Sequence, residues 1–373
     1  MYEVRVFHDI DDQFLKAEWE RLEREADVFP QSTYHWCATW WKHLSGGRRL
    51  HVVMVRDGRD RTLAVAPLCT EGTPLGRIIR SFPVNFGDFF EIITPPDTDR
   101  SLVFQAVFSY LLRYDNWYGV LLAPVNDHSR FFDFLRMQGV FTRRLVGNII
   151  ADISASSWPG YLKTLSRERR RFTRRKMQDL QSAHRVEVEI IRSERGFLEQ
   201  FDRIREMQAL RSRRDRPARS KRYMACAKEV YGGLFRRNQM LLFLLKADDR
   251  VVAYRLGFVK ERTFYDWNTN YDVDWSNYSP GLISIAYLIR CLIEEGFTSL
   301  DFMAGVYDYK ISYAPKHQMR YNHRVVLGKR SISGKLFRSY ELEWRERIRP
   351  YYRGAICGIS KLRGLLSRQP STP

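Results

Sequence analysis

The chain has 373 residues, a length that favours two ordinary domains over one oversized domain. Apolar residues make up 44% and aromatic residues 14% of the sequence, so the chain can bury a large core and is not intrinsically disordered. The formal net charge of +19 favours an anionic partner such as a phosphate, a nucleic acid or an acidic lipid, without choosing among them.

The positive charge is concentrated in three segments. Lys and Arg dominate residues 158–185, residues 203–222 and the sequence from Ser331 onward, whereas the rest of the chain is close to neutral. We therefore expect particular surfaces, and not the whole fold, to attract an anion. The helix expected at 158–182 has four interpretations: a solvated face, or a site for nucleotide phosphates, for an anionic glycan or lipid head group, or for tRNA.

Export and membrane spanning are not expected. The first residues lack an apolar core followed by a cleavage site, and no run of about eighteen apolar residues occurs. The five cysteines are widely spaced without a CxxC pair, which indicates reduced thiols in a cytoplasmic protein. The histidines lack metal-ligand spacing, so we expect no metal site.

In the first half, apolar periodicity predicts a mixed succession of strands and helices. In chain order the expected elements are a strand (2–7), two helices (11–25, 34–44), a hairpin (50–55, 62–68), a strand (89–93), a helix (99–114), a buried strand (118–123), a helix (129–138) and a strand (148–153). Such alternation is typical of a sheet covered by helices on both faces.

After the basic helix at 158–182, the second half repeats that order. The expected elements are a hairpin (240–245, 251–258), a strand (263–271), a helix (281–295), a strand (299–303), a short helix (307–313) and a strand (321–327). We interpret the chain as α/β (α+β), with tandem units that each have a mixed β-sheet flanked by helices. The expected units are 1–153 and 154–330, followed by a basic amphipathic helical tail at 331–373.

A strand feeds a helix through the segment Tyr278-Ser279-Pro280-Gly281-Leu282. The first N–H groups of a helix have no intrahelical partner, and together with the helix dipole they suit a pyrophosphate. Gly281 would let the anion approach the backbone. The alternative is an ordinary helix start, with Ser279 as N-cap and Pro280 at the first helical position.

Two polar groups flank this turn in the sequence. On the preceding strand, Asp266, Asn268 and Asn270 alternate and are expected to share one face, either as a solvated side or as a polar wall that positions an amine or a water. After the next strand, Tyr309 and Lys310 supply a phenol for a leaving thiolate and a cation for a phosphate or carboxylate, or else a packed aromatic and a surface lysine.

These residues resemble the GNAT superfamily of acyl-CoA N-acyltransferases, specifically its CelD-like (cellulose biosynthesis) branch. The matching residues are Tyr271-Asp272, Ser279-Pro280-Gly281, Asp301-Phe302, Gly305 and Tyr309-Lys310, together with the basic helix and Phe29-Pro30-Gln31-Ser32. The likeness covers most of residues 25 to 328. The commonest GNAT pyrophosphate loop, Q/R-x-x-G-x-G/A, is absent, and Ser279-Pro280-Gly281 stands in its place.

The resemblance implies transfer of an acyl group from acetyl-CoA or another acyl-CoA to an amine. It implies that the acceptor is an amino sugar or a precursor of an envelope polysaccharide. The implied roles are cofactor binding for Tyr278, Ser279, Pro280, Gly281 and Leu282, substrate binding for Asn268, Asn270 and Tyr271, proton removal by Asp266 or Asp272, thiolate protonation by Tyr309, and charge by Lys310. The N-terminal unit lacks a Ser-Pro-Gly counterpart, so we expect a degenerate copy that buttresses the second unit and shapes a cleft.

Two other functions stay open. The tandem architecture is similar to the Fem-type aminoacyltransferases, whose donor is aminoacyl-tRNA, and tRNA is the one nucleic acid we would expect as a partner. A non-catalytic accessory of exopolysaccharide or cellulose assembly would use the basic surfaces to bind a glycan or a synthase subunit.

The end of the chain has an amphipathic pattern. Apolar residues recur at three to four residue spacing between 351 and 366, with basic residues beside them. We expect either docking on an anionic membrane surface from the cytoplasmic side or a terminal helix that folds back onto the second unit.

Overall fold

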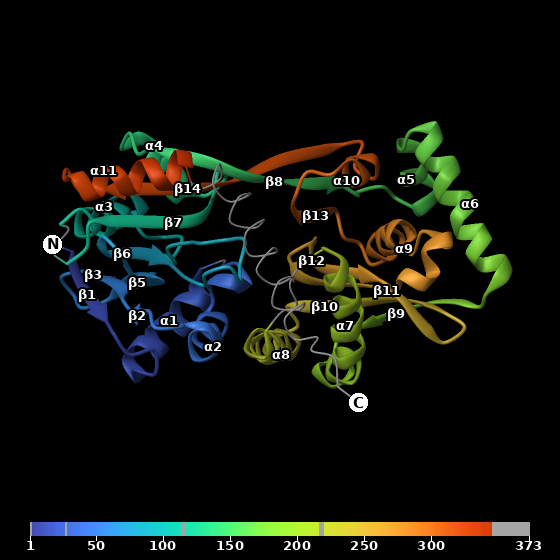
Figure 1. The fold of residues 1–373 in the computed structure, drawn as a ribbon, viewed down its shortest axis with the longest axis horizontal. Coiled ribbons are helices and arrows are strands. Elements are labelled where there is room, and N and C mark those ends of the chain that lie inside the picture. The colour runs from blue at the N-terminus through green and yellow to red at the C-terminus, as the bar shows by residue number, and fades with distance from the viewer. Residues whose placement is uncertain (1, 27, 114–115, 216–219, 345–373) are drawn as a thin grey trace, which may run out of the picture.

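The computed structural model describes residues 2–26, 28–113, 116–215 and 220–344. The molecule is elongated, and the two halves of the chain lie next to each other along its long axis (Figure 1).

The first half begins with a strand and two helices and continues as a succession of strands and helices (Figure 1). Its elements are β1 (Glu3–Phe7), α1 (Gln13–Glu25), the 3₁₀ helix η1 (Pro30–Ser32), α2 (Tyr34–Leu44), β2 (Arg49–Leu50), β3 (Val52–Arg56), β4 (Thr62–Ala66), β5 (Leu68–Thr73), β6 (Gly76–Ser81), α3 (Arg100–Leu111), β7 (Gly119–Asn126), α4 (Arg130–Met137) and β8 (Thr142–Asp152).

The second half begins with two helices that have no counterpart in the first. Its elements are α5 (Trp158–Thr164), α6 (Arg167–Ala183), β9 (Val186–Ile191), α7 (Glu194–Asp215), α8 (Lys221–Arg236), β10 (Met240–Ala247), β11 (Arg250–Lys260), β12 (Thr263–Tyr271), the 3₁₀ helix η2 (Val273–Tyr278), α9 (Pro280–Glu294), β13 (Ser299–Ala304), α10 (Asp308–Ser312), β14 (His317–Gly328), α11 (Ile332–Ser339) and the π-helix η3 (Tyr340–Trp344).

The repeat of element order is present from β1 to β8 and from β9 to β14. In each copy, two parallel strands pair with each other and a helix lies between them in the sequence. These are β6 and β7 with α3, and β12 and β13 with α9. The two predicted hairpins form, as β3 with β4 and as β10 with β11. The α/β class with a mixed sheet is therefore confirmed.

Several expected elements differ. The strand expected at 89–93 is reduced to a single bridge between Ile93 and Val65. The basic helix is interrupted, because Leu165 has an extended backbone and Ser166 accepts a hydrogen bond from Arg169 N–H as the N-cap of α6. Strands β5, β6 and β9 and helices α7 and α8 are additional to the predicted elements.

The two units exchange their last strands. β8, which ends the first unit, pairs with β13 of the second, and β14, which ends the second, pairs with β7 of the first. β8 and β14 also pair with each other along most of their length (Figure 1). We expected one sheet per unit, whereas a single 11-stranded sheet runs through both. The order of elements along the chain does not predict this exchange, because it does not determine which strands pair at the edge of each sheet.

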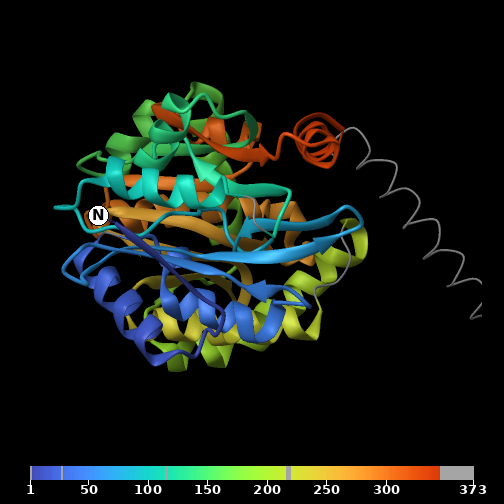
Figure 2. The ribbon, with the colours of Figure 1, turned by 90° about the vertical axis from the view of Figure 1, so that its left-hand side faces the viewer.

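Strands β1, β3 and β4 form a second, three-stranded sheet in the first half, on which α1 and α3 pack. Helices lie on both sides of the two sheets (Figure 2). One face carries α1, α2, α7 and α8, whose apolar side chains form one core that extends through both halves. The opposite face carries α3 and α4 over the first half, and α5, α6 and α9 over the second. Across the halves α2 packs on α8, where His35 of α2 lies at hydrogen-bond distance (3.2 Å) from the Val230 carbonyl of α8.

The expected tail is described only up to residue 344. There α11 packs against the sheet through Phe337, which lies edge-to-face on Tyr118. Residues 345–373, which carry the predicted membrane-docking pattern, lie outside the described residues. Among the described helices, none has the length and apolar character needed to cross a membrane.

Candidate active site

The first turn of α9 is open at its N-terminal end. Ser279, in a left-handed conformation (φ 54°), precedes Pro280, and its side chain does not cap the helix. Leu282 and Ile283 N–H bond to the Ser279 carbonyl, and Pro280 has no N–H. The Gly281 N–H has no hydrogen-bond partner in the described part of the chain. This end of the helix therefore keeps a free donor and its positive dipole.

The equivalent helix of the first unit, α3, is closed. The Asp99 carboxylate accepts hydrogen bonds from Ser101 N–H (3.1 Å) and Leu102 N–H (3.3 Å). A carboxylate on the first turn satisfies its donors and would repel a second anion. The two copies thus differ at the position where an anion would bind.

Gly281 is required by an aromatic neighbour. A Cβ atom at this position would lie 2.7 Å from Cδ1 of the Tyr271 ring. Cβ atoms essentially never lie so close to another heavy atom, so a larger residue would force the ring or the backbone to move. The sequence suggested that the glycine gives an anion access to the backbone, but in the structure the Tyr271 ring occupies the space that the missing side chain leaves. Tyr271 therefore forms one wall of the α9 first turn.

A buried arginine joins this turn to the sheet. Arg255 of β11 donates from Nη2 to the Gly281 carbonyl (3.0 Å) and from Nε to Ser284 Oγ (3.1 Å). Its Nη1 forms an ion pair with Asp266 of β12, and both side chains are 3% exposed. The backbone and Ser284 of α9 satisfy the remaining donors of Arg255, whereas Oδ1 of Asp266 is buried without a hydrogen-bond partner in the described part of the chain.

Lys310 holds the distorted end of β13. Its Nζ donates to the carbonyls of Phe302 (2.7 Å), Met303 (3.2 Å) and Ala304 (3.2 Å), which uses all three ammonium donors. Met303 and Gly305 both have positive φ, so the strand cannot continue its regular ladder here. The ammonium group therefore donates hydrogen bonds to carbonyls at the point where the strand departs from its regular ladder.

The same lysine is surrounded by carboxylates. Burial lowers the pKa of Lys310 to about 8, although Asp266 and Asp301 favour its charged form. Asp301 is completely buried, accepts a hydrogen bond from Met303 N–H (2.7 Å) and lies 3.5 Å from Arg320 Nη1. Burial raises the pKa of Asp301 to about 6 despite that arginine.

A loop of the first unit adds a third carboxylate to this cluster. Asp88 lies between β6 and α3, and the fully buried Gln31 holds the loop by accepting from Asp88 N–H (2.6 Å) and Phe89 N–H (3.1 Å). Burial, and then the charge of Asp301, raise the pKa of Asp88 to about 6. Asp88 as a residue is half-buried, whereas its carboxyl group is buried close to Asp301 and Lys310, and a perturbed pKa of this kind is typical of functional sites.

Hydrogen bonds, one ion pair and electrostatic interactions between nearby charges link these groups into one network. It runs from the Gly281 carbonyl through Arg255, Asp266 and Lys310 to the Asp88 and Asp301 carboxyls. The network connects the open helix end to a carboxyl whose proton affinity suits acid–base chemistry near neutral pH.

Comparison with known proteins shows which families and folds the chain is similar to. Residues 167–311 match the family model described as an acetyltransferase (GNAT) domain. The structure superimposes on FemX with a TM-score of 0.55 and 11% identity, over 85% of this chain and 96% of FemX. L-PGS from Bacillus licheniformis gives a TM-score of 0.53 with 12% identity, over 88% of this chain and 94% of that chain. A conserved protein of unknown function from Bacteroides thetaiotaomicron gives 0.54 with 10% identity, over 87% and 99%.

The fold is of the GNAT type. At these identities the structural likeness concerns the fold alone, whereas the domain match in the second unit is to an acyltransferase family. No curated protein sequence matches the chain. In the second unit, which contains this match and is called the GNAT unit below, the matched residues include α6, β11, β12, η2, α9, β13 and most of α10. These elements carry every residue of the network except Asp88.

The GNAT unit does not arrange its predicted polar strand face as expected. Between the pairs Tyr265↔Phe258 and Asn268↔Leu256, β12 advances three residues while β11 advances two. This bulge reverses the alternation. Asp266 therefore turns towards α9, and Asn268 and Asn270 turn towards α7, so the expectation of one shared face is wrong.

The amides on the α7 side have protein partners. Asn268 Oδ1 accepts from Gln208 Nε2 (3.0 Å) and from Tyr254 OH (2.8 Å), and Asn270 Nδ2 donates to the Met207 carbonyl (2.8 Å). These bonds fasten α7 to β12, and the sequence did not reveal them because α7 was not predicted.

Asp272 has a similar role at the end of the strand. It pairs with Arg203 of α7 (2.8 Å) and accepts from Asp274 N–H (3.1 Å) as the cap of η2. Asp272 is thus committed to two structural contacts.

The aromatic candidates lie on either side of the network. Tyr278 OH is 3.1 Å from His184 Nε2 at the end of α6, whose Nδ1 lies 2.6 Å from Asp248. Tyr309 of α10 stacks on Tyr307, with ring centroids 5.7 Å apart. Both tyrosines are partly buried against the core of the GNAT unit, Tyr278 beside α9 and Tyr309 next to Lys310.

Asp88 is the residue that sequence reasoning missed. It lies in the aromatic stretch Asn85-Phe86-Gly87-Asp88-Phe89-Phe90, which has no helical or strand period. A single acid among aromatic residues was the only available signal.

Proposed function

We propose that the chain is an acyl-CoA N-acyltransferase that moves an acetyl or other acyl group to an amine. The observation that carries this proposal is the open N-terminal end of α9, in contrast with the carboxylate-capped end of α3. The acetyltransferase domain match over residues 167–311 supports the same chemistry. In this proposal the backbone from Tyr278 to Leu282 binds the pyrophosphate of CoA.

Helix α6 supplies further positive charge beside this turn. Lys176 Nζ donates to the Asn277 carbonyl of η2 (2.7 Å), which fixes α6 next to the residues that lead into α9. Exposed Arg167, Arg171 and Arg174 recur at helical spacing on α6, as cations that a nucleotide phosphate would meet.

Proton removal from the amine is the task we assign to Asp88, directly or through one water. A carboxyl with a pKa of about 6 is mostly ionised at pH 7 and still accepts a proton more readily than an ordinary aspartate. Asp266 and Asp272, the carboxylates suggested by the sequence, are instead engaged by Arg255 and Arg203.

The remaining roles follow from the same network. Lys310 stays protonated below its pKa of about 8 and keeps the neighbouring carboxylates from repelling each other. Tyr309, next to it in α10, is proposed to protonate the leaving thiolate. As acceptor we propose an amino sugar or an amine of an envelope polysaccharide precursor, in line with the resemblance to the CelD-like branch.

The test is a calorimetric titration of CoA with two variants of Ser279. Ser279→Asp places a carboxylate at the helix end, as Asp99 does in the first unit, and is expected to abolish CoA binding. Ser279→Asn is the matched control, because it has nearly the same shape without the charge, and both residue types tolerate a left-handed backbone. Equal CoA affinity in both variants would remove the helix end from the proposal.

A second candidate is a Fem-type transferase with an aminoacyl-tRNA donor. It is favoured by the likeness to FemX over almost the whole chain of that protein. CoA binding distinguishes the two candidates. If the protein does not bind CoA but transfers an amino acid from aminoacyl-tRNA, it is the Fem-type enzyme. A protein that does neither leaves the non-catalytic accessory of polysaccharide assembly as the remaining candidate.

A further inference from the structure

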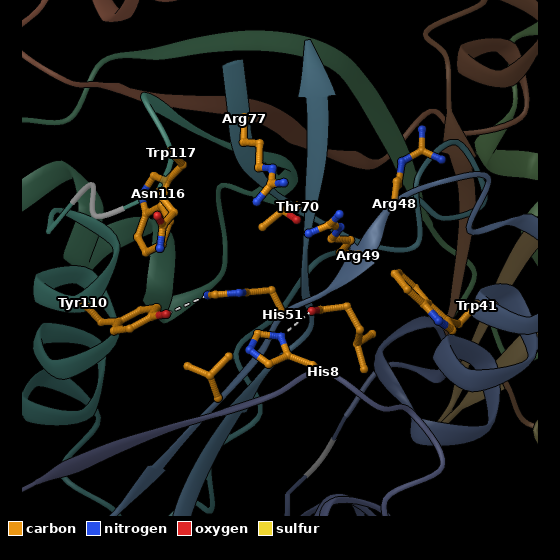
Figure 3. A pocket seen from close by; sticks show the side chains of 12 residues that line it. His8, Trp41, Arg48, Arg49, His51, Thr70, Arg77, Tyr110, Asn116 and Trp117 are labelled. Atoms are coloured by element: carbon orange, nitrogen blue, oxygen red, sulfur yellow. Dashed lines mark hydrogen bonds between the residues drawn. The ribbon is translucent and has the colours of Figure 1, made fainter.

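The first unit contains a cavity that the acyl-transfer chemistry does not use. Its volume is about 680 Å³, within the range of small-molecule sites. The cavity is lined by Val6, His8, Trp41, Arg48, Arg49, Leu50, His51, Thr70, Arg77, Tyr110, Asn116 and Trp117 (Figure 3). All of these residues belong to the first unit, whereas the α9 helix end belongs to the second.

Strand pairing gathers cations on one side of the cavity. Arg49 of β2 is opposite Thr70 of β5, and Thr70 is opposite Ile79 of β6. Arg77, two residues before Ile79, therefore shares the same face of the sheet as Arg49 and Thr70. Figure 3 shows the three side chains grouped together above the cavity floor.

These two arginines are available to a ligand. Arg49 and Arg77 are exposed, and their guanidinium groups form no hydrogen bond or ion pair in the described part of the chain. Arg48, the third arginine of the lining, differs because Glu71 accepts from its Nε (3.1 Å). Two unpaired guanidinium groups held on β2 and β6, the strands on either side of β5, suit a phosphate or diphosphate group, which accepts several hydrogen bonds at once.

Aromatic rings line two opposite sides. Tyr110 and Trp117 lie together, with centroids 5.7 Å apart, and Trp41 faces them from across the cavity (Figure 3). Flat apolar walls of this kind bind a planar ring by stacking.

The floor offers uncharged polar atoms. His51 Nε2 lies 2.7 Å from Tyr110 OH, and burial lowers the pKa of His51 to about 4, so its ring is neutral at physiological pH. His8 lies beside it, with its Nδ1 2.9 Å from the Leu50 carbonyl. Because the Leu50 carbonyl can only accept, Nδ1 of His8 is the donor of this hydrogen bond.

We propose that this cavity is a binding site for a nucleoside phosphate, separate from the acyl-transfer site. The phosphates contact Arg49 and Arg77, and the base lies between Trp41 and the Tyr110–Trp117 pair. The proposal does not depend on the identity of the acyl donor, because no residue of the cavity belongs to the charged network around Lys310.

The test is calorimetry of the full chain with UDP and ADP as probes, in the presence of saturating CoA so that the proposed α9 site is filled. Inorganic pyrophosphate and uridine serve as controls for the charge alone and the ring alone. We expect saturable binding of at least one diphosphate, at least tenfold tighter than either control and weakened by salt.

The decisive variant is Arg49→Ala/Arg77→Ala, which removes two exposed side chains and should melt like the parent protein. It is expected to weaken diphosphate binding at least tenfold, and Trp41→Leu should weaken it several-fold. The matched control is Arg195→Ala/Arg205→Ala, which removes two exposed arginines from α7 and should leave binding unchanged.

Three results would overturn the proposal. They are no saturable binding of either diphosphate, unchanged binding in Arg49→Ala/Arg77→Ala, and pyrophosphate binding as tightly as UDP and ADP, which would mean an anion site without a place for a base. Ser279→Asp, which tests the acyl-CoA site, should leave diphosphate binding here intact, so failure of one proposal is distinguishable from failure of the other.

Discussion

The Arg255–Asp266 pair lends itself to a quantitative test. In Arg255→Met, a side chain of similar volume replaces the arginine and leaves the Asp266 carboxylate buried without its main counter-charge. Breaking a buried pair in this way costs about 3–5 kcal/mol. The charges of Lys310 and Asp266 attract each other, so Lys310 still stabilises the Asp266 carboxylate in this variant. We therefore expect a cost near the lower end of this range.

The expected shift in melting temperature follows from the size of the chain. With an unfolding entropy of about 2.1 cal/mol/K per residue, 373 residues give about 0.8 kcal/mol per kelvin. A loss of about 3–5 kcal/mol therefore lowers Tm by about 4–6 °C. Circular dichroism melts of Arg255→Met against the parent protein measure this shift.

A double-mutant cycle tests the reason for the shift. Arg255→Met/Asp266→Leu removes both charges and should recover at least half of the lost Tm, because an apolar replacement of a buried pair is often close to neutral. If Arg255→Met melts within about 1 °C of the parent, or if the double variant melts lower than both single variants, the pair is not the anchor that the contacts indicate.

Three further predictions concern single positions. Asp99→Ala should lower the free energy of unfolding in urea by about 1 kcal/mol, whereas Ser279→Ala should change it by only a few tenths, because only Asp99 caps its helix. Gly233→Ala should cost about 1–3 kcal/mol in the same assay, since its Cβ would lie 2.0 Å from the imidazole that anchors α2 to α8, and Gly58→Ala, which meets open space, is the control. With a pKa of about 6, Asp88 changes from about 10% to about 90% ionised between pH 5 and 7, so the rate of CoA release should rise about tenfold and Asp88→Asn should flatten the profile.

The sequence predicts the parts of the fold whose pattern is local. The apolar runs of β3, β4, β10 and β11 and the turn before α9 all lie where expected. Helix α7 was missed because its many arginines suggested only a basic surface. Its buried residues Phe197, Phe201 and Ile204 nevertheless follow helical spacing, so an available signal was overridden by charge.

The candidate site depended on features without a local signature. Nothing in the residues of β12 marks the bulge that separates Asp266 from Asn268 and Asn270, because it is defined by pairing with β11. Asp88 reaches the cluster through a loop that Gln31 holds, more than fifty residues away in the sequence. Interactions that depend on tertiary contacts of this kind cannot be predicted from the periodicity of a single sequence.

The exchange of β8 and β14 also sets the order in which the protein can be completed during synthesis. The edge of β7 is finished by Asn126, but its partner β14 begins only at His317, so about 190 further residues must be made before that edge is covered. At about 5–20 residues per second, the edge stays open for about 10–40 s on the ribosome. Neither unit can close its sheet alone, because a fragment that ends at 153 exposes β7 and one that starts at 154 exposes β13. Expression of the GNAT unit by itself should therefore yield an aggregation-prone chain, and both proposed sites are to be studied in the full-length protein.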